Sequence, residues 1–177
     1  TCLNRGCIPT KTLFASADLA RRIAQAEELG IRVGPAEVDY AAVAKRKDRV
    51  VSTLRDGVGQ LLRANGVTVL EGRASFVSRT RLAVRGPSGT QHVRADQVIL
   101  ATGSVPAAPG SLPRHERIMD SRAFLEQTAL PERLVVMGGG YIGCELAAMA
   151  AALGSEVTIV EMLDDILLLL DGDVRRV

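Results

Sequence analysis

The sequence predicts an α/β fold. Apolar residues recur with the 3.6-residue period of helices as far as Leu62, and with the two-residue period of strands from Val67 onward. Nearer the end, a short apolar stretch, a glycine-rich turn and an alanine-rich segment follow one another. That order is typical of a strand, a turn and a helix in a β–α–β unit, so helices and strands are expected to be mixed along the chain.

The composition narrows the class of protein. Of 177 residues, 47% are hydrophobic and only 3% aromatic, so a large aliphatic core is expected. The net charge of +2 is too small to predict a nucleic-acid or membrane partner. The apolar run Ile166–Leu170 is far shorter than the ~20 residues of a membrane span. No signal peptide opens the chain, so we expect a cytoplasmic protein.

Two helices are expected before the strands. The first runs from Thr10 to Leu29 with Gly30 as its C-cap, and Asp39 caps the second. The basic run Lys45–Arg49 is interrupted by an acid and has no aromatic partner, so it is interpreted as a solvated helix face rather than a nucleic-acid site. Two glycines, Gly57 and Gly59, weaken the prediction for the last turns. The apolar face of the second helix is expected to comprise Val43, Val50, Val51, Leu54, Val58, Leu61 and Leu62.

The middle of the chain is predicted to form short strands. The residues Gly86-Pro87-Ser88-Gly89 indicate the turn of a hairpin, and a Pro/Gly-rich loop over Val105–Gly110 leads to a boundary between His115 and Asp120. A short connecting helix follows at Ser121–Gln127. The expected strands are Val67–Leu70, Ala74–Val77, Arg81–Arg85, Gln91–Arg94 and Gln97–Leu100.

A glycine motif lies between two further strands, expected at Leu134–Met137 and Glu156–Val160, with a helix over Cys144–Leu153. The motif reads Gly138-Gly139-Gly140-Tyr141-Ile142-Gly143, which is Gly-x-Gly-x-x-Gly with a strand before it and a helix after it. In such a motif the first glycine makes a tight turn, the second lets the backbone approach a pyrophosphate, and the third lets helix and strand pack closely.

An acidic residue supports this interpretation. Glu161 ends the second strand, roughly 20 residues after the glycines, where a carboxylate accepts hydrogen bonds from ribose 2′-hydroxyls. It would repel a 2′-phosphate, and Met162-Leu163-Asp164-Asp165 offers no arginine to hold one, so NAD is favoured over NADP.

Two cysteines, Cys2 and Cys7, stand five positions apart at the start of the chain. In an unbroken helix their Cα atoms would lie roughly 8–9 Å apart, beyond the ~4.4–6.8 Å of a disulfide. They can therefore pair only if the backbone leaves the helix between them, which Gly6 makes easy. Free buried thiols are an alternative. A zinc site is disfavoured because Cys144, His92 and His115 do not stand at ligand spacing.

The whole string Cys-Leu-Asn-Arg-Gly-Cys-Ile-Pro-Thr-Lys resembles the redox-active segment of the flavin-dependent disulfide reductases, the class I pyridine nucleotide-disulfide oxidoreductases, and most closely their dihydrolipoamide-oxidising members. The resemblance implies that Cys2 exchanges with the substrate disulfide and that Cys7 faces a flavin. It places Lys11 beside the flavin ring, pairs Glu145 with Lys11, and places Tyr141 in the nicotinamide pocket. Cys144 is interpreted as a small packing residue.

The same resemblance implies two domains. Residues 1–117 would be part of an FAD-binding domain, and residues 118–177 the first β–α–β unit of a Rossmann-type NAD-binding domain. Gly72-Arg73-Ala74 resembles the backbone near the adenine end of FAD, and Ala101-Thr102-Gly103-Ser104 resembles a second FAD motif. The residues expected to bind cofactors are therefore Lys11, Ala74, Thr102, Gly103, Ser104, Gly138, Gly139, Gly140, Tyr141, Ile142, Gly143, Glu145 and Glu161.

The implied reaction is the FAD-dependent oxidation of protein-bound dihydrolipoamide with reduction of NAD. The partner would be a lipoyl-bearing carrier protein of a 2-oxo acid dehydrogenase or glycine cleavage complex, and the full-length protein would be a homodimer. The resemblance places a flavin-binding segment before Thr1 and an acid–base histidine after Val177, so an internal fragment is expected. Another NAD(P)H-linked disulfide reductase or transhydrogenase of the family, or an inactive nucleotide-binding fragment, are the alternatives.

Overall fold

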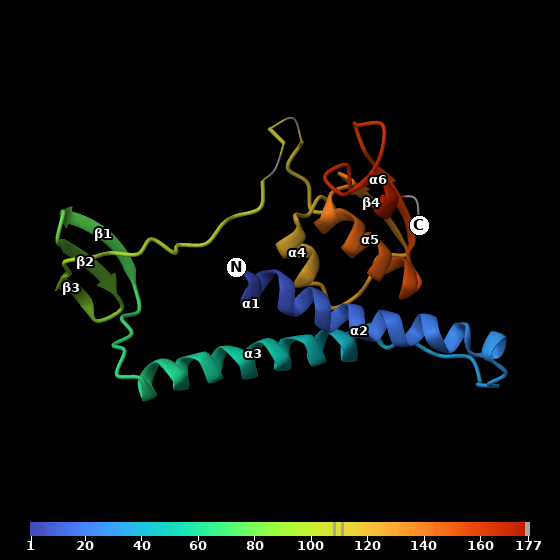
Figure 1. Ribbon diagram of the computed structural model, residues 1–177, viewed down its shortest axis with the longest axis horizontal. Coiled ribbons are helices and arrows are strands. Elements are labelled where there is room, and N and C mark those ends of the chain that lie inside the picture. Colours follow the sequence, from blue (N-terminus) through green and yellow to red (C-terminus); the bar gives the residue numbers. More distant parts are fainter. Residues whose placement is uncertain (108, 111, 176–177) are drawn as a thin grey trace. The chain divides into compact units, whose positions relative to one another are not determined.

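The computed structural model describes residues 1–107, 109–110 and 112–175. The chain divides into two compact units: unit 1 comprises Thr1–Leu54 and Pro106–Val177, and unit 2 comprises Arg55–Val105 (Figure 1). This division separates compact bodies and does not test the boundary expected between residues 117 and 118, which stays a prediction. Ala108 of the expected loop and the last two residues of the expected second domain lie outside the described residues.

The N-terminal helices of unit 1 are interrupted once. A single turn, α1 (Cys2–Arg5), is separated by Gly6 from the longer α2 (Cys7–Ala24). The helix predicted over Thr10–Leu29 is present, but it begins earlier, because Pro9 is tolerated in a first turn where N–H groups have no helical acceptor. Its final turn is a separate 3₁₀ helix, η1 (Ala26–Leu29), capped as expected by Gly30 with φ 76°.

The second helix, α3 (Tyr40–Ala64), begins at the predicted cap: the N–H of Ala42 donates to Asp39 Oδ1 at 3.0 Å. Neither Gly57 nor Gly59 interrupts it. Its expected apolar face is only partly covered, since Leu54, Val58 and Leu61 are exposed.

One residue of the basic run corrects the prediction of a fully solvated helix face. Lys47 is only 5% exposed. Its Nζ forms an ion pair with Asp48, whose side chain is itself mostly exposed. A lysine can bury its methylene stem while its charged end reaches the surface, which explains why a charge pattern alone missed this burial.

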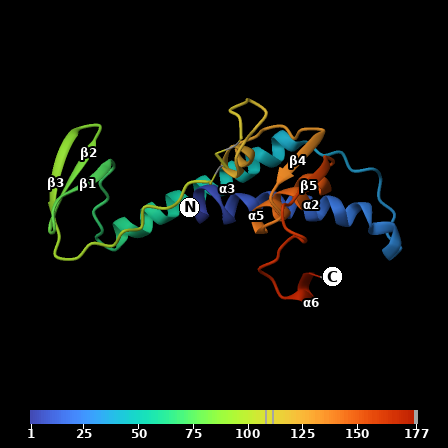
Figure 2. The same cartoon turned by 90° about the horizontal axis from the view of Figure 1, so that it is seen from above.

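Unit 2 contains a three-stranded antiparallel sheet in the order β1 (Arg73–Ser78), β2 (Arg81–Gly86), β3 (Gly89–Arg94) (Figures 1 and 2). The predicted hairpin is confirmed: Gly86 pairs with Gly89 across a turn formed by Pro87 and Ser88.

Two predicted strands of this region are wrong. Val67–Leu70 and Gln97–Leu100 are extended but belong to no sheet in the described part of the chain. A strand needs a neighbour that is hydrogen-bonded to its N–H and C=O groups, and no described strand pairs with either segment. Their side chains are exposed, Ile99 most of all. The expected loop motif at 101–104 consequently follows no strand.

The predicted β–α–β unit is confirmed in unit 1. Strands β4 (Arg133–Met137) and β5 (Glu156–Val160) pair in parallel, and α5 (Tyr141–Ala152) connects them. This helix begins earlier than predicted, directly at the glycine turn. Before it, the shorter-than-expected α4 (Ser121–Leu125) is capped by Asp120, which accepts from the Ala123 N–H at 2.8 Å. A last short helix, α6 (Gly172–Arg175), ends the described chain.

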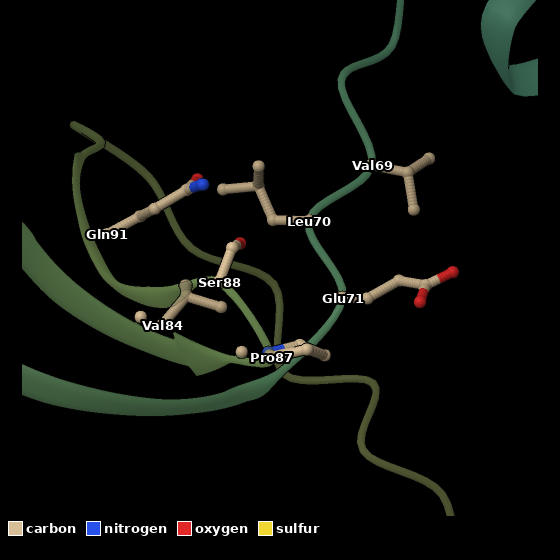
Figure 3. A pocket seen from close by; sticks show the side chains of 9 residues that line it. Val69, Leu70, Glu71, Val84, Pro87, Ser88 and Gln91 are labelled. Carbon is tan, nitrogen blue, oxygen red and sulfur yellow. The ribbon is translucent and has the colours of Figure 1, made fainter.

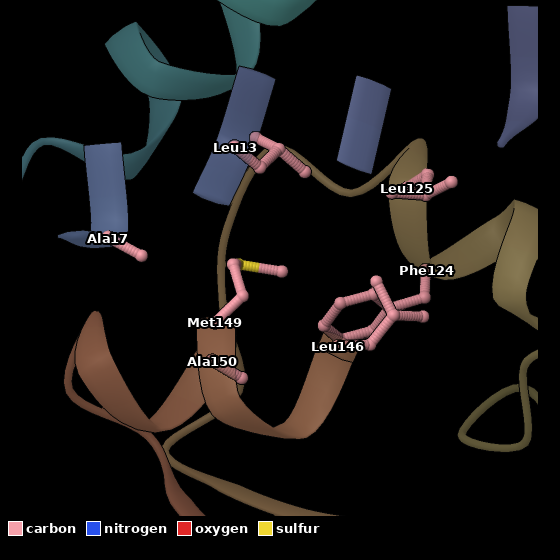
Figure 4. Packing of buried hydrophobic residues seen from close by; sticks show 7 residues of the cluster. All are labelled: Leu13, Ala17, Phe124, Leu125, Leu146, Met149 and Ala150. Atoms are coloured by element: carbon pink, nitrogen blue, oxygen red, sulfur yellow. The ribbon is translucent and has the colours of Figure 1, made fainter. Parts of the chain in front are cut away.

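The core of unit 1 lies where α2, α4 and α5 meet (Figure 4). Met149 and Leu146 project from α5 toward Leu13 of α2 and Phe124 of α4, and Leu13 and Met149 are completely buried. No described helix is long and apolar enough to cross a membrane. The buried cluster comprises Leu13, Ala17, Phe124, Leu125, Leu146, Met149 and Ala150.

We expect Met149→Ala to lower the free energy of unfolding by about 2–5 kcal/mol, because it leaves a cavity among side chains that cannot fully close it. Met162→Ala is the matched control, since Met162 is 93% exposed and its loss should change stability by less than about 0.5 kcal/mol. Urea denaturation of both variants measures the difference. Equal losses in the two variants would contradict the packing described for α5.

Candidate functional site

The two N-terminal cysteines form a disulfide bond with their Cα atoms 4.7 Å apart. The backbone leaves the helix at Gly6, as the spacing predicted, and a Cβ there would lie 3.3 Å from the Cα of Cys2, so a larger residue would crowd the bridge. Both cysteines are exposed. The free-thiol interpretation is therefore excluded for this pair, and the sulfurs are accessible to a reactant from solution.

An ion pair joins the helix of the disulfide to the helix of the glycine motif. Lys11 Nζ contacts Glu145 Oε1, linking α2 to α5 across 134 positions of sequence. Lys11 follows Cys7 by one helical turn, so both project from the same face of α2. The two side chains are 60% and 42% exposed, so the pair contributes little to stability. Its effect is to hold a cation near the disulfide.

The glycine turn has the geometry that its sequence predicts. Gly138 adopts φ 102°, a conformation that favours glycine, and its N–H donates to the Val160 carbonyl at 2.8 Å. A Cβ on Gly143 would overlap the carbonyl oxygen of Gly138, so this glycine is required where α5 meets the end of β4. A Cβ on Gly140 would meet nothing within 4 Å, which leaves room beside the turn.

The remaining motif residues, Tyr141 and Ile142, are exposed at the start of α5. The first N–H groups of a helix have no acceptor within it and carry the positive end of its dipole, so this end can bind an anion. Together with the space beside Gly140, these groups fit a dinucleotide pyrophosphate.

The carboxylate of Glu161 lies against the glycine turn. It accepts hydrogen bonds from the N–H groups of Leu163 at 3.0 Å, Gly139 at 2.6 Å and Met162 at 2.7 Å. These three donors, Leu163 first, lower the pKa of Glu161 below its ordinary range, so it stays ionised at neutral pH. A carboxylate offers about four lone-pair positions, so the ionised Glu161 has one left that fits a ribose hydroxyl of a nicotinamide dinucleotide.

Sequence reasoning missed a second set of contacts at this turn. The Gly139 carbonyl accepts from the Leu167 N–H at 2.7 Å and from the Cys144 thiol at 3.3 Å. Burial raises the pKa of the Cys144 thiol, and the Glu161 carboxylate raises it further, so the thiol stays protonated as a donor. No sequence motif predicts these contacts, because they depend on the path by which the chain comes back to the glycine turn after β5.

The residues expected near the adenine end of FAD and those of the second expected FAD motif both lie in unit 2. Ala74 is on β1, paired with Val84 of β2, whereas Thr102, Gly103 and Ser104 lie in a loop where Gly103 adopts φ 83°. A pocket of about 300 Å³ in this unit, lined by Val84 and other side chains shown in Figure 3, contains none of these residues. Their role toward FAD therefore stays a prediction.

The two histidines lie on a strand and in a loop. Within the described ranges there is no group of three or more His, Cys, Asp or Glu residues that could hold a metal ion. His92 lies on β3 opposite Ala83, and His115 Nδ1 accepts from the Arg117 N–H at 3.1 Å in a loop.

Comparison with known proteins agrees with this geometry. The family model described as pyridine nucleotide-disulphide oxidoreductase matches residues 1–177. The chain is 45% identical to a dihydrolipoyl dehydrogenase of Chlamydia pneumoniae and 42% identical to one of Bacillus subtilis, in each case over 99% of its length. It spans 38% and 39% of those two relatives, so it corresponds to a part of them.

Solved structures give the same result. LpdA from Mycobacterium tuberculosis superposes with a TM-score of 0.86 at 28% identity, covering 99% of this chain and 39% of that one. A Cu(II) complex of the HOCl-induced flavoprotein disulfide reductase of Escherichia coli gives a TM-score of 0.81 at 31% identity, covering 99% and 37%. The mixed α/β fold is thus that of one part of a flavoprotein disulfide reductase, and its small sheets are consistent with a partial domain.

We expect Glu161→Gln to lower the urea midpoint at neutral pH, because it removes the charge that the three N–H groups stabilise. The folded pKa lies below the ordinary value of 4.5. The stabilisation is therefore complete above that value and is lost as pH falls through the folded pKa. The difference in urea midpoint between Glu161→Gln and wild type should therefore become smaller in acid. Glu156→Gln, at the exposed start of β5, is the control. A difference in urea midpoint that does not depend on pH would contradict the three hydrogen bonds assigned to the Glu161 carboxylate.

Proposed function

Because the chain belongs to the pyridine nucleotide-disulphide oxidoreductase family, we propose that the whole protein oxidises protein-bound dihydrolipoamide to lipoamide and reduces NAD. The names of the curated relatives, dihydrolipoyl dehydrogenases, support this substrate. The single observation that carries the proposal is the Lys11–Glu145 ion pair, because it joins the exposed disulfide to the glycine turn within one unit. The disulfide and the glycine turn, which are the two ends of the proposed electron-transfer route, therefore lie on two helices that pack against each other.

The first step is thiol–disulfide exchange at the exposed bridge. A thiolate of the substrate attacks the Cys2 sulfur, the Cys2–Cys7 bond breaks, and Cys7 leaves as a thiolate. The second substrate thiol then attacks the mixed disulfide, which releases oxidised lipoamide and a reduced Cys2. Two electrons have now moved from the substrate to the cysteine pair.

Lys11 stabilises the product of this exchange. Its ammonium group lies one helical turn after Cys7, and a nearby cation favours a thiolate over a thiol. Glu145 holds that ammonium group in place from α5. A flavin bound beside this pair would supply the redox chemistry that links the two cysteines to a nicotinamide dinucleotide. The residues proposed to hold FAD are Lys11, Ala74, Thr102, Gly103, Ser104 and Glu145.

The glycine turn and Glu161 are proposed to hold NAD. The N–H groups at the start of α5 would receive its pyrophosphate, and Gly140 leaves room for it. Glu161 would accept from the ribose hydroxyls, and its negative charge disfavours the 2′-phosphate of NADP. Tyr141 is proposed to line the nicotinamide pocket.

The proposed partner is a lipoyl-bearing carrier protein of a 2-oxo acid dehydrogenase or glycine cleavage complex, in the cytoplasm. An exposed disulfide suits a dithiol on a flexible arm, since the carrier need not enter the protein. We propose a homodimer for the full-length protein. The likeness to an HOCl-induced disulfide reductase supports a second candidate, another disulfide reductase of the family. A panel of disulfide and dithiol substrates separates the two.

We expect Cys2→Ser in the full-length protein to abolish flavin reduction by dihydrolipoamide, because no bridge remains to accept electrons. Flavin reduction by NADH should be retained, since that half-reaction does not use the cysteines. Anaerobic absorbance spectroscopy of the flavin follows both half-reactions in one sample. Normal dihydrolipoamide oxidation by this variant would overturn the proposed mechanism.

We also expect the 177-residue chain on its own to be colourless after purification and to show no turnover. Of the predicted FAD residues, Thr102, Gly103 and Ser104 follow the segment Gln97–Leu100, which pairs with no described strand, so this part of the expected flavin site has no sheet to support it. Absorbance in the visible range and a dihydrolipoamide–NAD assay test this. A yellow, active preparation would contradict the expectation without affecting the assignment of Cys2.

A further inference from the structure

Gly139 lies in the middle of three consecutive glycines, Gly138 to Gly140. Glycine loses more conformational freedom on folding than any other residue, and a Gly-Gly peptide can turn its carbonyl to either side with little steric cost. In a turn that receives an anion this freedom matters, because a carbonyl oxygen directed at a phosphate would repel it. Some other part of the protein must therefore hold the peptide in one orientation.

Both polar groups of Gly139 are held by residues that follow it in sequence. Its N–H donates to Glu161 Oε2 at 2.6 Å. Its carbonyl accepts from the Leu167 N–H at 2.7 Å and from the Cys144 thiol at 3.3 Å. A flip of either adjoining peptide would break at least one of these hydrogen bonds.

The contacts close one side of the turn and leave the other side open. A Cβ on Gly139 would lie 2.5 Å from Cγ2 of Ile166, so the Ile166 side chain rests directly against this glycine. A Cβ on Gly140 would meet nothing within 4 Å. The segment that follows β5 thus covers the turn at Gly139 and leaves it uncovered at Gly140.

The segment after β5, which returns to the glycine turn, has an unusual backbone conformation where it contacts Gly139. Leu167 has φ 55°, and within the described ranges no other non-glycine residue has a positive φ. This left-handed conformation is unfavourable for leucine, and it directs the Leu167 N–H at Gly139. The Leu170 N–H donates to the Leu167 carbonyl at 2.8 Å, which forms a separate turn within the segment after β5. We call residues Asp165–Leu167 the strap.

We propose that the strap is a positioning element of the nucleotide site, which holds the Gly139 carbonyl toward the Leu167 N–H and leaves the N–H groups at the start of α5 available to the phosphates. This inference rests on the proposed function, and it assigns a role to residues outside the glycine motif. A turn ordered in advance loses less freedom when the nucleotide binds, so loosening the strap weakens affinity without touching the nucleotide.

The test uses the full-length flavoprotein with the variants Ile166→Ala, Ile166→Val, Gly139→Ala and the Gly139→Ala/Ile166→Ala double. Leu169→Ala is the matched control, because Leu169 belongs to the same returning chain but is 83% exposed. The dissociation constant of NADH is measured by titration. Hydrogen exchange of the backbone over residues 138–143 is measured without nucleotide, and flavin reduction by dihydrolipoamide reports whether each variant is folded.

Ile166→Ala should weaken NADH binding about five-fold and speed exchange over residues 138–143, whereas Ile166→Val should recover most of both. Gly139→Ala should weaken binding about ten-fold in the wild-type background and clearly less when Ile166 is already alanine, because Cγ2 of Ile166, 2.5 Å from the added Cβ, is then absent while Cβ of residue 166 at 2.9 Å remains. Flavin reduction by dihydrolipoamide should be the same in Leu169→Ala as in wild type, so this variant is the control for both measurements.

Independent effects of the two substitutions, or Ile166→Ala behaving like Leu169→Ala in both measurements, would overturn the role of the strap. If wild type and Leu169→Ala both fail to bind NADH, the proposed function is wrong. The exchange measurement then still decides whether the strap orders the turn. If Ile166→Ala does not fold, Asp165→Ala decides the same question: Asp165 Oδ1 accepts from the Ile166 N–H at 2.9 Å, so its loss should loosen the strap, weaken NADH binding and speed exchange over residues 138–143.

Discussion

The close packing of α2 against α5 is the constraint on which the rest of the structure depends. Leu13 and Met149 exclude solvent between the two helices, and Lys11 and Glu145 join them at the surface. One helix carries the disulfide at its start, and the other begins at the glycine turn. Because both helices contribute to one core, the two chemically active ends are fixed to each other by ordinary apolar packing rather than by any bound group.

The features that the sequence predicted well are those set by neighbouring residues. The hairpin follows from the four residues around Pro87 and Ser88, the cap of α3 from Asp39, and the β–α–β unit from the glycine motif. Each needs only a local steric or hydrogen-bonding requirement. The same is true of Gly6, whose small size between two cysteines is sufficient to predict that the helix breaks there.

The features that the sequence did not reveal depend on distant partners. Val67–Leu70 has the alternation of a strand, but a strand exists only where another chain segment accepts its hydrogen bonds, and none is described beside it. The burial of Lys47 depends on which residues, distant in sequence, pack against its methylene groups. The contacts of Ile166 and Leu167 with Gly139 arise from a left-handed residue that no composition or period indicates. The sequence pattern thus predicts helices, strands and motifs. Contacts with residues distant in sequence decide which of their groups are buried or hydrogen-bonded.

The missing side chain at Gly143 has a consequence for mutational studies of such proteins. A methyl group there would meet the Gly138 carbonyl oxygen, so it would push the start of α5 away from the strand. Glu145 lies only two positions further along the same rigid helix and would move with it, away from Lys11. A substitution in the glycine turn would therefore also loosen the Lys11–Glu145 ion pair on the helix that carries Cys7, and a second substitution that restores the position of α5 should correct both changes together.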